Sequence, residues 1–324
     1  MAKMLDKKDQ KLLYELDLNA RLPINQLAKK IGLSQEATRY RIGRLLEKKI
    51  VLGFVTYLNF TKLGYFGYAV YCRYSNMTEQ KKQEIKDFLK GHEKIYWIAE
   101  YGGRYDLSFS IFAKTPQEFD DAFTSISAKC SGFLTDITLI TKLEPHKYPR
   151  NYLTDKKQNS NPKPANNQSY KLNKIEELVL KHLATDSRIS SADIARKINK
   201  PLSTVIYTIK KLEKNEIIGG YIAIIDPVSF SYQAFQLNII TQNMTPEKLR
   251  SLFTYCEHNP NIMLAIKVLG DWNIELIYEV ENAKKMQEQI IELRNKFGDM
   301  MKDIELLNFF EDYIKLNHYP FKIQ

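Results

Sequence analysis

Ser34-Gln-Glu-Ala-Thr-Arg-Tyr-Arg-Ile-Gly-Arg-Leu-Leu-Glu-Lys48 is the stretch that decides the fold of this chain. At 100° per residue it forms an amphipathic helix, and Ser34 is well placed to cap its first turn. We expect the inward side to carry Thr38, Ile42, Leu45 and Leu46. We expect the outward side to carry Glu36, Ala37, Tyr40, Arg41 and Arg44, with Arg39 on the flank. An aromatic among arginines is typical of the reading helix of a helix-turn-helix (HTH), and the alternative is a solvated basic face.

The composition is that of a globular protein with an anionic partner. The 324 residues are 44% hydrophobic, which is enough for two to four domains with cores, and the net charge is +10. Cys72, Cys130 and Cys256 lie far apart without a Cys-x-x-Cys pair, so we expect no metal site and a reducing compartment. No apolar run reaches the roughly 18 residues of a membrane span, and no signal core is present. We therefore expect a soluble, cytoplasmic, nucleoid-associated protein with no membrane partner.

The chain repeats itself with one constant shift. Leu5 corresponds to Leu172, and the same gapless shift of 167 residues pairs Tyr40 with Tyr207. A single register across the whole unit indicates an internal duplication. Between the two units, residues 154–171 are polar and contain prolines, which predicts a flexible linker.

Each unit begins with a predicted winged HTH domain. In the first unit helices are predicted over 6–18, 24–31 and 34–48, and the β-forming residues 50–58 predict a wing or a connecting strand. A second part then follows with the order βαββαβ, which is that of a ferredoxin-like α/β sandwich. Its predicted elements lie at 68–74, 78–90, 96–101, 107–112, 115–128 and 133–143, and again at 235–241, 246–255, 263–268, 273–280, 283–296 and 302–309.

The predicted class is therefore α+β, with two winged HTH domains that are each followed by a ferredoxin-like domain. We assign the first HTH domain to 1–60, its α/β domain to 61–153, the linker to 154–171, the second HTH domain to 172–227 and the second α/β domain to 228–324.

Positive charge is confined to the HTH domains and the linker. Residues 1–60 contain 12 basic and 6 acidic side chains, whereas residues 61–144 contain 11 of each. The linker region 145–171 has a net charge of +5, residues 172–227 of +2 and residues 228–324 of −3. A protein that binds DNA needs positive charge on its DNA-binding domains to neutralise phosphates. Because the positive charge lies in the HTH domains and the linker, double-stranded DNA is the expected partner.

These features together resemble the Lrp/AsnC (feast/famine) transcription regulators. The matching stretches are Leu5-Asp-Lys-Lys-Asp-Gln-Lys-Leu-Leu, Asn19-Ala-Arg-Leu-Pro, Leu27-Ala-Lys-Lys-Ile-Gly-Leu-Ser, Arg41-Ile-Gly-Arg-Leu-Leu-Glu-Lys-Lys-Ile-Val-Leu-Gly-Phe and Gly103-Arg-Tyr-Asp-Leu. The resemblance implies a DNA-binding regulator whose α/β domains pair, with an amino-acid effector that can bind between them. Two copies in one chain can pair internally as a pseudo-dimer, and a homo-oligomer is the alternative.

The two reading helices are predicted to differ. The second helix has Pro201 in place of Ser34, Thr208 in place of Arg41 and Lys211 in place of Arg44, so the first should dominate DNA affinity. The predicted DNA-binding residues are Ser34, Gln35, Glu36, Ala37, Arg39, Tyr40, Arg41, Arg44 and Lys48, and more weakly Ser203, Thr204, Tyr207, Lys210 and Lys211. Glu36, Ala37 and Tyr40 are the better candidates for contact with bases, and the arginines for contact with phosphates.

A glycine-containing turn is the predicted effector site. Gly102, Gly103, Arg104, Tyr105 and Asp106 combine exposed backbone N–H groups, a cation and an acid. The alternative is a hairpin whose glycines satisfy turn geometry. In the second unit Asn273 replaces Asp106, so one such site is expected rather than two.

The sequence gives no catalytic grouping. The five histidines are scattered, and neither a metal pair nor a phosphate loop is apparent, so no catalytic residue, no cofactor and no metal are expected. Sirohaem decarboxylases share this architecture and are the enzyme alternative, but their histidine- and arginine-rich stretch is not evident at 63–69. An amino-acid-sensing module without DNA binding is the third hypothesis.

Overall fold

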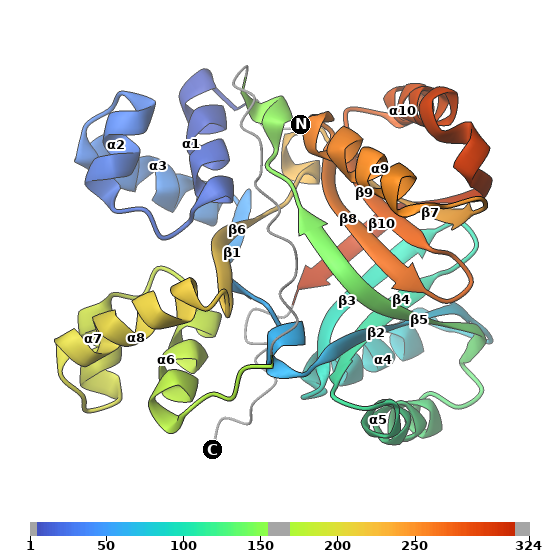
Figure 1. Ribbon diagram of the computed structural model, residues 1–324, viewed down its shortest axis with the longest axis horizontal. Helices are drawn as coiled ribbons and strands as arrows, with labels where there is room; N and C mark the ends of the chain where they lie inside the picture. The colour runs from blue at the N-terminus through green and yellow to red at the C-terminus, as the bar shows by residue number, and fades with distance from the viewer. Residues whose placement is uncertain (1–4, 155–168, 315–324) are drawn as a thin grey trace.

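The computed structural model describes residues 5–154 and 169–314, with side chains up to Phe310. Two helical domains lie side by side at one end, and a closed sheet with helices outside it forms the other end (Figure 1). Within the described ranges, no helix combines the length and apolar character that crossing a membrane requires. Most of the predicted linker, residues 155–168, lies outside the described residues.

The first HTH domain follows the predicted helix order. Asp6 accepts a hydrogen bond from the Asp9 N–H and begins the first helix, and Ser34 accepts one from the Ala37 N–H and begins the third. Gly32 ends the second helix at φ 68°, a left-handed conformation that favours glycine. The elements are α1 (Lys7–Leu18), α2 (Ile24–Ile31), α3 (Gln35–Glu47), β1 (Val51–Leu58) and the short η1 (Thr61–Leu63).

The second HTH domain repeats these elements with different caps. Asn173 and Glu176 form a capping box, whereas Pro201 precedes the third helix without a side-chain hydrogen bond. The elements are α6 (Lys174–Thr185), α7 (Ser191–Lys197), α8 (Leu202–Lys214), β6 (Ile218–Ile225) and η3 (Val228–Phe230).

The strand after each third helix is not a wing. β1 pairs antiparallel with β6 of the other unit, centred on Val55 opposite Ile222, which the 167-residue shift makes equivalent positions. Of the two predicted alternatives the connecting strand is therefore correct. A single hydrophobic core includes residues of both HTH domains and of this two-stranded ribbon, so the two domains form one body.

Each α/β domain has the predicted βαββαβ order. The first contains β2 (Phe66–Tyr74), α4 (Glu79–Gly91), β3 (Ile95–Gly102), β4 (Leu107–Ala113), α5 (Pro116–Lys129), β5 (Leu134–Lys147) and η2 (Asn151–Leu153). The second contains β7 (Gln233–Thr241), α9 (Pro246–His258), β8 (Ile262–Leu269), β9 (Ile274–Val280), α10 (Ala283–Phe297), η4 (Gly298–Met300) and β10 (Met301–Ile314). Within each domain the strands lie in the order second, third, first, fourth, which confirms the ferredoxin-like topology.

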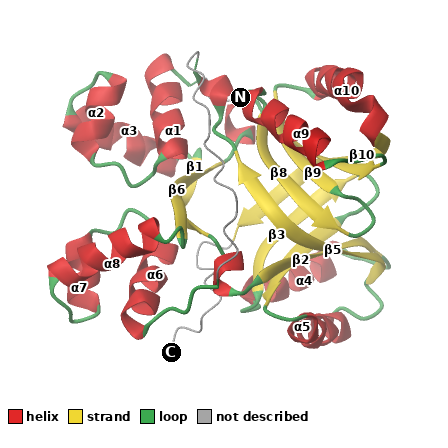
Figure 2. Ribbon diagram, in the orientation of Figure 1, coloured by secondary structure: helices red, strands yellow, loops and turns green. Residues whose placement is uncertain are grey.

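The two four-stranded sheets join into one closed barrel. β5 pairs with β8 and β10 pairs with β3, so the last strand of each unit adds to the second strand of the other. Both last strands run beyond their predicted ends, because these added residues find partners only in the other unit. Figure 2 shows the strands enclosed by helices α4, α5, α9 and α10 on the outside.

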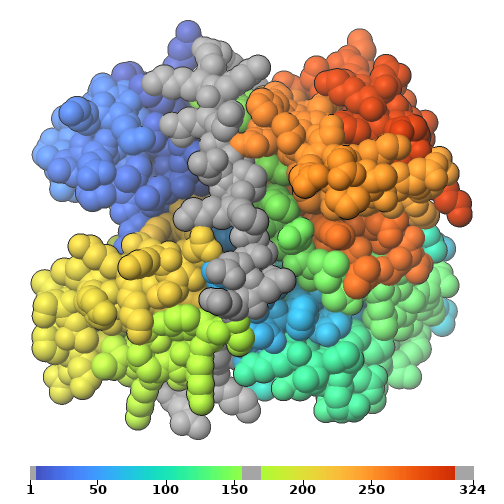
Figure 3. All heavy atoms as spheres, viewed as in Figure 1, coloured from blue at the N-terminus to red at the C-terminus, as the bar shows by residue number. Residues whose placement is uncertain are grey.

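The HTH domains are exchanged between units. Figure 3 shows the first HTH domain beside the second α/β domain, and the second HTH domain beside the first α/β domain. Asp17 of α1 forms an ion pair with Arg150 at 2.7 Å, and Arg150 also forms an ion pair with Glu279 of β9 at 2.7 Å. The chain is therefore an intrachain pseudo-dimer, as expected from the duplication. The exact domain limits stay a prediction.

Candidate nucleic-acid interface

The first two turns of α3 carry exposed polar and aromatic side chains. Gln35, Glu36 and Arg39 are exposed, and the Tyr40 side chain stands out with 71% of its surface accessible. Ser34 uses its hydroxyl as the helix cap, and Ala37 is half-buried. These turns present polar and aromatic groups of the kinds that contact base edges and phosphates in a DNA groove.

Two of the predicted arginines are half-buried and form ion pairs with the α1 region of the same domain. The Arg41 guanidinium donates to Asp6 and Asp9 of the α1 region, each at 2.7 Å, and Arg44 forms an ion pair with the same Asp9. The hydrogen bonds that Arg41 donates to Asp6 and Asp9 raise the pKa of Arg41. The expectation that Arg41 faces outward is wrong, because its long side chain turns back towards α1. Its contact with DNA stays a prediction, and Lys48 at the end of α3 is exposed.

The second unit keeps one of these ion pairs in altered form. Lys211 contacts Glu176 at 2.8 Å, in the place of Arg44 and Asp9. Thr208, the counterpart of Arg41, is buried and donates to the Thr204 carbonyl oxygen. Arg44 in the first unit and Lys211 in the second therefore each link the third helix to the first by an ion pair.

The outward surface of α8 is more apolar than that of α3. Tyr207 is 69% exposed, like Tyr40, but Leu202 and Ile206 stand where α3 has Gln35 and Arg39. Leu46 of α3, which is predicted on the inward side, is also exposed. The remaining predicted contacts divide into Ser203 and Lys210, which are exposed, and Thr204 and Lys211, which are half-buried.

Paired contacts between the HTH domains fix the spacing of α3 and α8. Arg21 donates to the Ser187 carbonyl oxygen at 2.5 Å and lies over the Tyr221 ring, while Arg188 donates to the Ala20 carbonyl oxygen and lies over the Phe54 ring. The shift of 167 residues exchanges these two sets of contacts. The two reading helices are thus related by a pseudo-two-fold axis, as a DNA-binding dimer requires.

The predicted effector turn lies where the barrel closes. Gly103 has φ 134°, and a Cβ there would come within 3.2 Å of the Leu306 carbonyl oxygen. Gly270 has φ 150°, and a Cβ there would come within 2.8 Å of the Leu139 carbonyl oxygen. Gly102 lies against the Phe310 ring. The glycines thus let each turn approach the last strand of the other unit.

The polar side chains of this turn are engaged within the protein. The Asp106 carboxylate accepts from the Tyr74 N–H at 2.8 Å, and the Asn273 amide oxygen accepts from the Thr241 N–H at 2.9 Å in the same place of the second unit. Tyr105 is buried, and its hydroxyl contacts Thr138. Arg104 is exposed, 3.8 Å from Glu305. An acid or an amide serves this hydrogen bond equally well, which favours the structural alternative for the turn.

Sequence reasoning missed a buried polar cluster inside the barrel. Glu275 of β9 is 1% exposed, accepts from Tyr71 at 3.0 Å and from Trp272 at 3.1 Å, and lies 3.7 Å from Lys142. Gln236 joins the cluster by donating to the Tyr71 hydroxyl. The repeat could have indicated the cluster, because Glu275 and Gln236 of the second unit correspond to Ser108 and Ala69 of the first. These are strand positions that face inward. In the part of the chain that the structure describes, no cluster of His, Cys, Asp or Glu is arranged to hold a metal.

Comparisons with known proteins agree with the two HTH domains. Residues 5–46 match the AsnC-type helix-turn-helix domain, and residues 172–218 match the winged helix-turn-helix DNA-binding family. An uncharacterized HTH-type transcriptional regulator of Pyrococcus horikoshii is 32% identical over 142 residues, which are 44% of this chain and 95% of the relative. The HTH-type transcriptional regulator LrpA of the same organism is 30% identical over 40% of this chain and 90% of its own length.

A solved structure shares the whole architecture. The crystal structure of the siroheme decarboxylase NirDL covers 95% of this chain, and 92% of that chain is covered, with a TM-score of 0.59 and 12% sequence identity. At this identity the likeness shows the fold alone. The relatives that carry the sequence similarity are about one unit long, and this chain contains two units. The chain belongs to the Lrp/AsnC family of HTH-type transcriptional regulators, as a tandem duplication within one polypeptide.

Proposed function

We propose that this regulator binds DNA sequence-specifically through its intrachain pair of HTH domains, with α3 as the principal reading helix. The observation that carries the proposal is the contrast between the exposed first turns of the two reading helices. Gln35, Glu36 and Arg39 offer polar groups on α3 where α8 offers Leu202, Ser203 and Ile206. Base-edge recognition in the major groove needs hydrogen-bonding side chains, so α3 is the better reader.

Phosphate contacts come from basic side chains that are not tied inside the domain. Arg39 in the second turn of α3 and Lys48 just after its end are exposed. Arg41 and Arg44 hold Asp6 and Asp9 instead, so their role is to set the angle of α3 against α1. Each freely exposed cation that neutralises a phosphate releases a counterion, which makes binding salt-dependent.

The pseudo-two-fold axis predicts a paired but unequal operator. The Arg21 and Arg188 contacts hold α3 and α8 in a fixed spacing within one chain, so a single chain spans two half-sites. The half-site that faces α3 should be read more strictly than the one that faces α8. Such a regulator works at the nucleoid in the cytoplasm, and higher assembly of chains is an open alternative.

Selection of bound sequences from a random DNA library tests this proposal. We expect an imperfect palindrome with one strongly constrained half-site, and Tyr40→Ala should relax that half more than Tyr207→Ala relaxes the other. If the selection enriches no sequence and the protein also fails to bind DNA at low salt, the DNA-binding function is rejected. A symmetric palindrome would reject only the inequality of the helices.

An amino-acid effector at Gly102–Asp106 stays a prediction with weaker support. The glycines and the Asp106 carboxylate serve barrel closure, so a ligand there would compete with existing contacts. A thermal-shift screen of the twenty amino acids, repeated with Arg104→Ala, measures it. A shift that the variant abolishes supports an effector at this turn, and no shift at millimolar concentration counts against one.

We propose that the chain is not an enzyme, although it shares its fold with a siroheme decarboxylase. Tyr71, Tyr101, Trp272 and their neighbours occupy the interior between the two sheets as packed side chains. Residues 63–69, where the decarboxylases carry their histidines and arginines, contain none. A Soret band that appears on mixing the protein with sirohaem would overturn this.

A further inference from the structure

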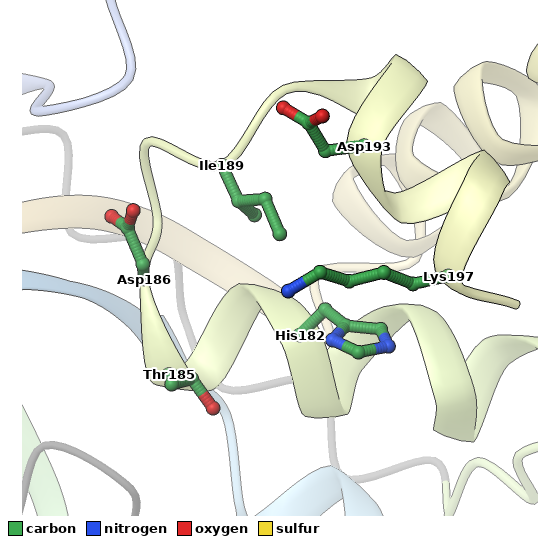
Figure 4. A pocket seen from close by; sticks show the side chains of 6 residues that line it. All are labelled: His182, Thr185, Asp186, Ile189, Asp193 and Lys197. Atoms are coloured by element: carbon green, nitrogen blue, oxygen red, sulfur yellow. The ribbon is translucent and has the colours of Figure 1, made fainter.

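A cavity of about 280 Å³ lies on the second HTH domain, away from the exposed face of α8. Its walls are His182, Thr185 and Asp186 at the end of α6, Ile189 in the following loop, and Asp193 and Lys197 of α7. Figure 4 shows the Lys197 side chain reaching from α7 into the cavity, with the His182 ring to one side and Ile189 to the other. The cavity thus has a cationic centre and an apolar wall.

At the corresponding place in the first HTH domain, the equivalent lysine has a carboxylate partner. Lys30 of α2, the counterpart of Lys197, contacts the Glu15 carboxylate of α1 at 2.6 Å. In the second unit the position of Glu15 is taken by His182. Replacement of the glutamate removes the carboxylate that would meet Lys197, and among the described residues no hydrogen bond or ion pair engages the Lys197 ammonium.

The charges around Lys197 define the missing group. Burial lowers the pKa of His182, and the charges of Lys197 and Lys181 lower it further, so the imidazole is neutral and available as a hydrogen-bond donor. Asp186 and Asp193 also line the cavity and disfavour a ligand with several negative charges. Asp193 lies one turn before Lys197 on α7 and forms an ion pair with Arg196, whereas Asp186 follows α6 and can accept a hydrogen bond from a donor group of the ligand.

We propose that this cavity binds a small organic monocarboxylate that also carries a hydroxyl or amino donor. Its carboxylate occupies the place that Glu15 fills in the first unit and pairs with Lys197, with the His182 ring as a second contact. The donor group faces Asp186, and Ile189 packs against the carbon skeleton. The volume exceeds that of a lone carboxylate and accommodates a molecule of several carbons.

The cavity adjoins residues that contact the first unit. Ile189 lines the cavity, and its carbonyl oxygen accepts the hydrogen bond from Arg21 of the first HTH domain. The neighbouring Ser187 N–H donates to the Phe54 carbonyl oxygen of the connecting strand at 3.0 Å. The loop at 186–189 therefore touches both the ligand site and the contact that spaces the two reading helices.

The direct test is NMR titration of the full chain with sodium L-lactate, compared with propionate, which lacks the hydroxyl, and with sodium chloride at equal ionic strength. We expect saturable shifts confined to residues 182–197, tighter for lactate than for propionate and absent with chloride. A shift that chloride reproduces, or no saturation by about 100 mM, would overturn the proposal, because a Kd of 100 mM already corresponds to a binding free energy of only about 1.4 kcal/mol.

Two reciprocal variants provide the matched control. His182→Glu rebuilds the ion pair of the first unit, so lactate affinity should fall about tenfold or more while the protein stays folded. Glu15→His frees Lys30 and should create a second set of shifts at residues 15–30. Unchanged lactate binding in His182→Glu, with folding verified by circular dichroism, would contradict the assignment, as would no response at residues 15–30 in Glu15→His.

Discussion

The two HTH domains repeat contacts that join them, such as the Ala20 N–H bond to the Tyr221 carbonyl oxygen and the Ser187 N–H bond to the Phe54 carbonyl oxygen, and differ in the side chains around those contacts. The pairs formed by Arg21 and Arg188 exchange under the 167-residue shift, as do the pairs formed by Arg44 with Asp9 and by Lys211 with Glu176. By contrast Arg39, Glu15 and Asp17 of the first domain become Ile206, His182 and Ala184 in the second. In a homodimer both halves must change together, whereas a duplicated chain keeps the pairing contacts and lets each half acquire its own surface.

The largest expected effect concerns Asp17, which has no counterpart in the second unit. Asp17 is 1% exposed and holds both Lys147 and Arg150, which fastens the first HTH domain to the second α/β domain. Asp17→Ala leaves Lys147 without its carboxylate partner and Arg150 with Glu279 alone, and should cost about 3 to 5 kcal/mol in the free energy of unfolding. Chemical denaturation measures it, and a loss below about 1 kcal/mol would show that the ion pairs do not fasten the domain.

The same group gives a pH signature. Burial would raise the pKa of Asp17, but the positive charges of Lys147 and Arg150 outweigh it and lower the pKa below 3.8. Since the folded pKa is the lower one, this stabilisation is complete above about pH 4 and is lost as the pH falls through the folded value. Asp17→Asn should therefore flatten the acid limb of the stability curve, and an unchanged limb would contradict the assignment.

Closure of the barrel should respond unequally to equivalent glycines. A Cβ at Gly270 would lie 2.8 Å from the Leu139 carbonyl oxygen, against 3.2 Å for Gly103 and Leu306. We expect Gly270→Ala to cost roughly 2 to 4 kcal/mol and Gly103→Ala less. Gly64→Ala is the control, because its φ is 78° with nothing within 4 Å of the added Cβ, and it should cost about 1 kcal/mol. Equal losses for all three would remove the steric argument.

The barrel interior offers a smaller, paired comparison. Glu275 accepts hydrogen bonds from Tyr71 and Trp272, while its counterpart Ser108 has a buried hydroxyl with no partner in the described residues. Glu275→Gln should cost about 1 to 2 kcal/mol, and Ser108→Ala should be neutral or slightly stabilising. Thermal unfolding of both variants measures the difference. A destabilising Ser108→Ala would show that its hydroxyl is satisfied in solution.

The sequence predicted the order of elements because periodicity and caps are local. The caps at Ser34 and the turn at Gly32 follow from neighbouring residues, and the helices end within a few residues of their predicted limits. The pairing of the strand after α3 was not predictable in the same way, because β1 pairs with β6 of the other unit. For the same reason the glycine turn at 102–103 was recognised as a turn but not as a barrel contact.

Within the reading helix, helical periodicity predicted burial better than side-chain direction. Thr38, Ile42 and Leu45 are buried as expected. Arg41 lies near the edge between the two faces, and its length lets the guanidinium return to Asp6, which a helical projection does not represent. Leu46 lies at the opposite edge and is exposed. Edge positions are therefore decided by packing partners rather than by the period.

The central claim, that α3 dominates DNA affinity, is tested most directly by salt-dependent anisotropy titrations on the selected operator. The variants are Arg39→Ala with Lys48→Ala on α3, and Lys210→Ala with Lys214→Ala on α8, all exposed positions. The α3 pair should weaken binding at least about tenfold and reduce the salt slope by about 2, whereas the α8 pair should change affinity a few-fold. Equal losses from the two pairs, or a greater loss from the α8 pair, would contradict the account.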